Sequence, residues 1–204
     1  MKGHPVTTPT VRRGRYAAVA LAAVAAIAAV VVGLAQPARP AGRAFLPLHP
    51  VAAPAGWTRA ALPNGTAVLS YPPALHPIAG DKGTVSAAHL GPGGTFQLYL
   101  NATPRQGTET LAHWAAFRLR FLRADSAANA HLVAAAQRVR FRGGTGSCAI
   151  DDYTTRVGAR HFQEIACLVQ GRHGGSVIVA AAPAATWARA RSLLLRTVAA
   201  YQVH

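Results

Sequence analysis

The hydrophobic pattern divides the chain into an apolar N-terminal segment and a longer part in which apolar and polar positions alternate. Residues 1–15 are polar and basic, whereas residues 17–35 carry no charged or polar side chain. A bilayer core of about 30 Å is crossed by about 20 helical residues, and cleaved signal peptides have apolar regions of only about 7–15 residues. The pattern therefore predicts a retained transmembrane helix at residues 16–35, preceded by a basic tail at 1–15.

Basic residues on the two sides of this segment predict its orientation. Residues 1–15 contain four of them, whereas only Arg39 and Arg43 follow the segment closely. Because an excess of Lys and Arg stays in the cytoplasm, we expect the N-terminus inside and the C-terminal part outside the cell membrane. The alternative is a signal peptide cleaved near Ala35, which would release a secreted protein.

A proline-rich stretch at residues 36–54 follows the apolar segment. It contains five prolines, a residue that breaks helices and does not pair in central strands. Because proline-rich chain favours an extended conformation, we expect a semi-rigid linker here. It would hold a domain of residues 55–204 away from the membrane.

Within residues 55–204, runs of apolar residues bounded by glycine or proline predict a sheet. Strands are expected at residues 67–71, 83–90, 95–103 and 176–181. Asn64-Gly65 is expected to form a tight turn before the first of these strands, because both residues tolerate positive φ angles.

Two further segments show the helical period. The first begins at Thr108 or Thr110, either of which is a suitable N-cap. Its apolar positions share one side of the helix and are expected to dock on the sheet: Leu111, Trp114, Phe117, Phe121 and Leu122. The second helix closes the chain, with apolar residues at Trp187, Leu194, Val198 and Tyr201. The predicted fold class is therefore α+β, an antiparallel sheet flanked by two main helices and preceded by the transmembrane helix.

Both cysteines of the chain, Cys148 and Cys167, lie at equal distances from Val157-Gly158. If these two residues form the centre of a turn between antiparallel strands, the cysteines are directly opposed. Opposed residues in such a ladder have Cα atoms about 4.5–5.5 Å apart, which a disulfide can bridge. The spacing predicts a cross-strand disulfide, which is typical of an oxidising compartment outside the cytoplasm.

The same register places Asp151 opposite Glu164, with His161 nearby. Facing carboxylates repel each other, unless a cation lies between them, an arginine bridges them, or one of them keeps a proton. One interpretation is a metal-binding or acid/base pair, which would suit a metal- or carboxylate-dependent envelope hydrolase. The other is neutralisation by the abundant arginines.

The chain has 21 basic and six acidic residues, a net charge of +15. Such a charge suits nucleic acid or another polyanion, but the arginines are spread along the chain without a dense basic block, so we do not expect nucleic acid as a partner. Arg138, Arg140 and Arg142 alternate with Val139 and Phe141, which predicts a strand with one basic face. This strip is a candidate binding site for an anionic polymer or lipid; the alternative is a solvated strand face.

The order of elements, with "VLSYPPAL" near the first strands and "TETLAHW" at the start of the first helix, resembles the Mog1/PsbP-like α+β fold. The arrangement is similar to that of small actinobacterial envelope proteins and lipoproteins with this fold. The resemblance covers about residues 55–204. It implies a binding or accessory role more often than catalysis.

The sequence contains no motif for a catalytic nucleophile, a zinc site or a phosphate-binding loop. We therefore expect no cofactor and no metal. The leading hypothesis is a single-pass, membrane-anchored envelope protein with a monomeric, non-catalytic domain outside the membrane. That domain would bind an envelope protein, a lipid or a wall polymer.

Overall fold

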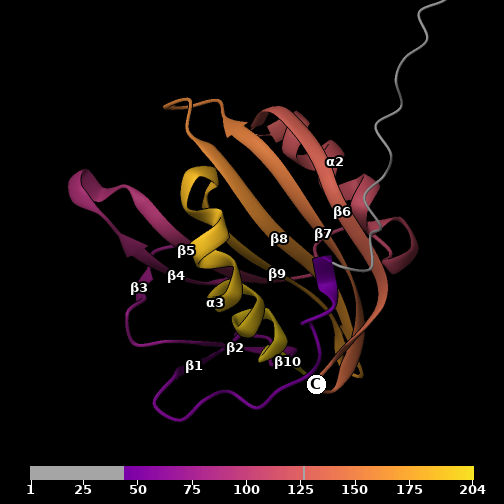
Figure 1. Ribbon diagram of the computed structural model, residues 1–204. Coiled ribbons are helices and arrows are strands. Elements are labelled where there is room, and N and C mark those ends of the chain that lie inside the picture. The colour runs from indigo at the N-terminus through magenta and orange to yellow at the C-terminus, as the bar shows by residue number, and fades with distance from the viewer. Residues whose placement is uncertain (1–43, 126) are drawn as a thin grey trace, which may run out of the picture. The chain divides into compact units, whose positions relative to one another are not determined.

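The computed structural model describes residues 44–125 and 127–204 (Figure 1). The predicted cytoplasmic tail, the transmembrane helix at 16–35 and the first part of the linker lie outside the described residues. Within the described ranges, no helix is both long enough and apolar enough to cross a membrane.

A seven-stranded antiparallel sheet forms the centre of the described domain (Figure 1). In spatial order its strands are β3 (His76–Ile78), β4 (Val85–Leu90), β5 (Phe96–Pro104), β9 (Gly174–Pro183), β8 (His161–Gly171), β7 (Gly144–Thr155) and β6 (Ala127–Phe141). The predicted strands at 83–90, 95–103 and 176–181 correspond to β4, β5 and β9. Because β9 returns to pair with β5, it joins the early strands to the long hairpins of the C-terminal half.

A small three-stranded sheet brings the last residues of the chain to the first strands. Its order is β1 (Thr58–Ala61), β2 (Ala67–Tyr71) and β10 (Gln202–Val203). The predicted turn lies between β1 and β2, where Gly65 has a φ of +72° and Asn64 Oδ1 accepts a hydrogen bond from Thr66 N. The sequence pattern did not predict β10, because a strand of two residues shows no periodicity.

Two helices cover opposite faces of the large sheet. The 3-10 turn η2 (Leu111–His113) leads into α2 (Trp114–Asp125), which packs on β6, β7 and β8. The turn η3 (Ala184–Thr186) leads into α3 (Trp187–Ala199), which packs on β8 and β9 from the other side. Figure 1 shows α3 crossing in front of these strands, with α2 behind them. The predicted antiparallel α+β architecture of the domain is thus confirmed.

The buried stripe of α2 differs from the predicted one. Trp114 and Leu122 are each 2% exposed, but Phe121 is 47% exposed. Arg118 lies midway between Trp114 and Leu122 at four-residue spacing, so this side chain faces the sheet. Phe121 lies beside the stripe and stacks on Phe117, with 6.4 Å between the ring centroids. The prediction that Phe121 docks on the sheet is therefore wrong.

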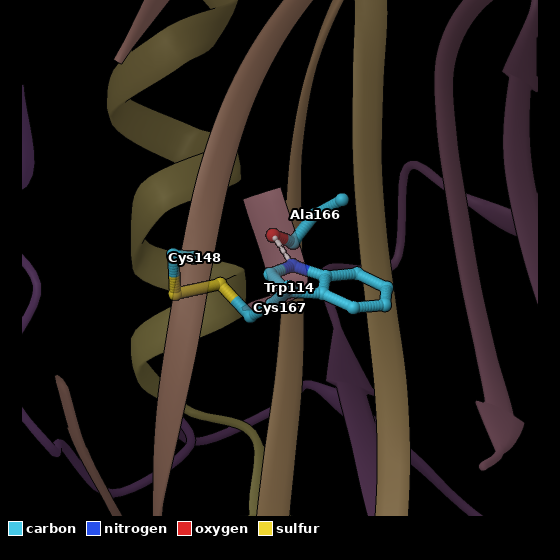
Figure 2. Close-up of a disulfide and its surroundings, with 4 residues drawn as sticks. All are labelled: Trp114, Cys148, Ala166 and Cys167. Atoms are coloured by element: carbon cyan, nitrogen blue, oxygen red, sulfur yellow. Dashed lines mark hydrogen bonds between the residues drawn. A yellow bond between two sulfur atoms is a disulfide. The ribbon is translucent and has the colours of Figure 1, made fainter. Parts of the chain in front are cut away.

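The hairpin of β7 and β8 has the predicted register, with Cys148 opposite Cys167. The two cysteines form a disulfide, and their Cα atoms are 4.1 Å apart. Figure 2 shows this bond beside Trp114, whose indole Nε1 donates a hydrogen bond of 2.9 Å to the carbonyl oxygen of Ala166. Ala166 and Cys167 are neighbours in one strand, so their side chains point to opposite faces of the sheet. The disulfide belongs to the core under α3, and Trp114 covers the other face.

Residues 44–54, which belong to the predicted linker, lie against α3. Phe45 and Leu48 are 6% and 8% exposed and form part of the core. Val51 N donates a hydrogen bond of 3.1 Å to the carbonyl oxygen of Ala199, the last residue of α3. Proline excludes regular secondary structure in this segment, but it does not prevent the apolar side chains between the prolines from docking.

We predict that replacing Cys148 and Cys167 together by alanine destabilises the domain. The disulfide closes a loop with a sequence separation of 19. In the chain-entropy model, losing it costs about 3 kcal/mol, or about 10 °C in Tm for a domain of this size. Thermal unfolding by circular dichroism measures the shift. Reductant should lower the Tm of the wild type but not of the double variant; equal Tm values without reductant would contradict the prediction.

Candidate functional site

Asp151 and Glu164 face each other across β7 and β8, as the sequence predicts. Glu164 shares its sheet face with Ala166 and Leu168, which pack under Trp114. The two acidic residues are only 0% and 1% exposed. The carboxylates therefore meet inside the protein, between the sheet and α2, and do not line an open site.

Arg118 of α2 neutralises Glu164. Its Nε and Nη2 atoms donate hydrogen bonds of 2.7 and 2.6 Å to the same carboxylate oxygen, Glu164 Oε1. Burial alone would lower the pKa of Arg118, but the charge of Glu164 and its hydrogen bond raise that pKa above the usual value. The arginine therefore stays charged, and the interpretation of neutralisation by an arginine is confirmed for Glu164. The sequence analysis did not single out Arg118, although its four-residue spacing from Trp114 and Leu122 could have revealed it.

Asp151 is accommodated in a different way, because its raised pKa lets it hold a proton up to about neutral pH. Neither of its carboxylate oxygens has a hydrogen-bond partner in the structure. Burial, followed by the negative charge of Glu164, raises the pKa of Asp151 to about 7, and the charge of Arg118 opposes this rise. The pKa of the adjacent Tyr153 is also raised, first by burial and then by Glu164. Asp151 is therefore about half protonated at neutral pH and mostly protonated below it.

His161 does not join this pair, because it lies on the opposite face of the sheet. Its Nε2 is 2.6 Å from Asp152 Oδ1, and Gln163 Nε2 donates to Asp152 Oδ2 at 2.8 Å. His131 Nε2 lies 3.8 Å from the same Oδ1. Burial alone would raise the pKa of Asp152, but these hydrogen bonds and the two histidines lower it. The structure brings Asp151 and Glu164 together and places His161 in a separate cluster.

Arg138 and Arg140 of the arginine strip lie on β6, an edge strand of the large sheet, whereas Arg142 follows its end, is half-buried and forms a backbone bridge to Gln202. Arg138 and Arg140 are exposed, whereas Val139 and Phe141 between and after them are buried. The pairing with β7 shifts just before Val139, and Arg138 has a φ of +57°, so the strand bulges at this point. The predicted alternation of basic and apolar sides is confirmed, and its use for binding anions stays a prediction.

Two of the clefts at the surface of the described domain exceed about 300 Å³, the lower end of typical ligand pockets. One, of about 450 Å³, lies between residues 47–52 and the outer side of α3. The other, of about 400 Å³, lies at the ends of β5 and β8, and its lining includes Phe96 and His161. Neither is lined by Asp151 or Glu164. In residues 44–125 and 127–204, no group of three or more His, Cys, Asp or Glu side chains could hold a metal ion.

Comparison with known proteins identifies the fold. No protein-family model matches the chain, and no curated protein matches its sequence significantly. One match is the solved structure of cyanobacterial PsbP (CyanoP) from Synechocystis. The matched region spans 74% of this chain and 94% of the CyanoP chain, with 15% sequence identity and a TM-score of 0.53. Another match is the crystal structure of the Ran-binding protein Mog1p of Saccharomyces cerevisiae. The matched region spans 72% of this chain and 95% of the Mog1p chain, with 10% sequence identity and a TM-score of 0.50. The predicted Mog1/PsbP-like fold is thereby confirmed, and at such identities the likeness extends to the fold alone.

We predict that Asp151→Asn changes how stability depends on pH. Because the pKa of Asp151 is about 7 in the folded protein and 3.8 in the reference state, the wild type loses stability as the pH rises between these values. Below pH 3.8 Asp151 is protonated in both states, and its full contribution to the stability of the folded protein is present. By pH 8 the free energy of unfolding of the wild type should have fallen by on the order of 4 kcal/mol, and Asp151→Asn should show no such fall. Urea unfolding at several pH values from about 4 to 8 measures both profiles. Asp81→Asn, at an exposed residue, is the control; parallel profiles for wild type and Asp151→Asn would contradict the prediction.

We also predict that Arg118→Met destabilises the domain by about 3–5 kcal/mol, because it leaves Glu164 buried without its partner. Adding Glu164→Gln should restore part of this loss, since the second change removes the stranded charge. Free energies of unfolding from urea titrations measure both effects. Arg120→Met, at an exposed residue of the same helix, is the matched control. If Arg118→Met cost no more than Arg120→Met, the ion pair would have no structural role.

Proposed function

We propose that the chain is a single-pass, membrane-anchored envelope protein whose domain lies outside the membrane and binds a partner without catalysis. The observation that carries the location is the disulfide between Cys148 and Cys167. Cross-strand disulfides persist in oxidising compartments and are rare in the cytoplasm. The apolar segment at residues 17–35 and the basic residues before it support the same orientation independently.

The buried carboxylates support a binding role. A hydrolase that used Asp151 and Glu164 would need at least one of them to reach substrate or water. Both side chains are enclosed by the sheet and α2, and Glu164 Oε1 is already occupied by the Arg118 guanidinium. The unpartnered oxygens of Asp151 face the protein interior, where they cost stability and activate no solvent. The pair therefore suits a structural role within a binding domain.

The structural neighbours support the same proposal. Mog1p is described as a Ran-binding protein, and CyanoP is the cyanobacterial PsbP. The first shows that a protein of this fold can serve to bind another macromolecule. Folds do not determine functions, so this likeness adds support only at the level of a binding role.

Two reporter variants, each with one cysteine added to the native disulfide-bonded pair, test the topology on intact cells. Val157 is 90% exposed at the tip of the β7–β8 hairpin, whereas Cys148 and Cys167 are 1% and 0% exposed. We predict that a membrane-impermeant maleimide labels Val157→Cys on intact cells without reductant. Thr8→Cys, in the basic N-terminal tail, should be labelled only after lysis.

Each other outcome has a distinct meaning. Labelling of Val157→Cys only after lysis would place the domain in the cytoplasm and overturn the proposal. Labelled protein in the medium, shortened at its N-terminus, would instead support cleavage near Ala35. The wild-type chain, which keeps both native cysteines, is the control for background labelling.

A further inference from the structure

The cleft between residues 47–52 and α3 combines an apolar floor with a cationic rim. Val51, Leu195 and Ala199 contribute apolar surface to its lining. Arg191, Ser192 and Arg196 line it from α3, and His49 lines it from the facing segment. This is the composition expected for a ligand with an anionic end and a hydrocarbon part.

Two arginines give the rim its charge and are held in place. Arg191 Nη2 donates a hydrogen bond of 2.7 Å to the carbonyl oxygen of Ala44. The Arg196 guanidinium lies 6.0 Å from the centre of the Trp57 ring. Among the described residues neither arginine forms an ion pair, and neither residues 44–54 nor α3 contain an acidic residue. Their positive charges are therefore not compensated locally by carboxylates.

The length of the chain limits how far this cleft can lie from the membrane. This step rests on the proposed function, in which residues 16–35 span the bilayer. From Ala35 to Ala44 the chain can extend over at most about 30 Å. Since Ala44 contacts Arg191 directly, the cleft lies within that reach of the bilayer surface.

We infer that this cleft binds an anionic phospholipid of the same membrane. A guanidinium group of the rim would pair with the lipid phosphate, for which arginine has a matching bidentate geometry, and the second arginine would add positive charge. The Ser192 hydroxyl, also on the rim, can donate a hydrogen bond to the headgroup. The apolar floor would receive the first part of an acyl chain. Lipid binding at this site would hold the domain against the membrane surface.

Native mass spectrometry of the full chain in neutral detergent micelles tests this inference, with phosphatidylglycerol and phosphatidylcholine as probes. The wild type should retain phosphatidylglycerol in preference to phosphatidylcholine. Arg191→Gln with Arg196→Gln should weaken that retention by about 30-fold, from the usual contribution of each basic residue near an anionic membrane. Arg120→Gln with Arg172→Gln makes the same change of net charge at exposed residues outside the cleft and should leave retention unchanged.

A second variant separates lost binding from lost folding. Ala188→Glu adds a negative charge to an exposed residue of the cleft and removes no existing contact of either arginine. It should also weaken retention of phosphatidylglycerol, with an unchanged melting temperature. Equal retention of both lipids by the wild type, or an equal loss in the Arg120→Gln, Arg172→Gln control, would overturn the inference.

Excess inorganic phosphate distinguishes a lipid site from a site for soluble anions. Phosphatidylglycerol should stay bound in its presence, because the acyl chain contributes to binding. Complete displacement by phosphate would overturn the lipid assignment. Because the lipid measurement uses detergent micelles, a negative result would not bear on the membrane topology. The topology is tested separately, since labelling of Val157→Cys only after lysis would refute the proposed membrane orientation.

Discussion

The register between β7 and β8 is the constraint on which most of the domain depends. Residues 164–169 of β8 are buried without interruption, so this strand is covered on both faces. A shift of one residue would move Cys167 and Ile165 to the α2 side and Glu164 to the apolar core under α3. The disulfide between Cys148 and Cys167 excludes that shift covalently. Both helices therefore dock on surfaces whose composition this one ladder determines.

The buried acidic pair illustrates the cost of that arrangement. Glu164 is compatible with the interior because Arg118 supplies two charged hydrogen bonds, and Asp151 because it can keep a proton. Buried ion pairs often add little net stability, since desolvation offsets the attraction between the charges. The contribution of this pair is positional, because only one rotation of α2 presents Arg118 to Glu164. The same rotation leaves Phe121 beside the contact and half exposed.

The two faces of the large sheet also differ in what covers them. The α2 face is closed around the acidic pair, whereas the α3 face carries the cleft formed with residues 47–52. The segment that forms one wall of this cleft leads directly to the predicted membrane helix. In the proposed membrane anchoring, this cleft would lie on the side of the domain from which the chain continues toward the bilayer.

The sequence by itself determined the local elements and the hairpin. Alternation marked the strands, the helical period marked α2 and α3, and the symmetry of the cysteines about Val157-Gly158 predicted both the disulfide and the facing of Asp151 and Glu164. These features depend on residues close together in the chain or on one turn. They could therefore be derived from spacing alone.

Only the tertiary structure decided how the acidic residues are neutralised and where the clefts lie. Arg118 and Glu164 are 46 residues apart, and their contact depends on the rotation of α2 above the sheet. His161 seemed close to the acidic pair in sequence, but strand alternation sends it to the other face with Asp152. Residues 44–54 became a wall of the cleft because Phe45 and Leu48 bury apolar surface against the core. Each of these outcomes depends on the packing of distant segments, which leaves no local pattern in the sequence.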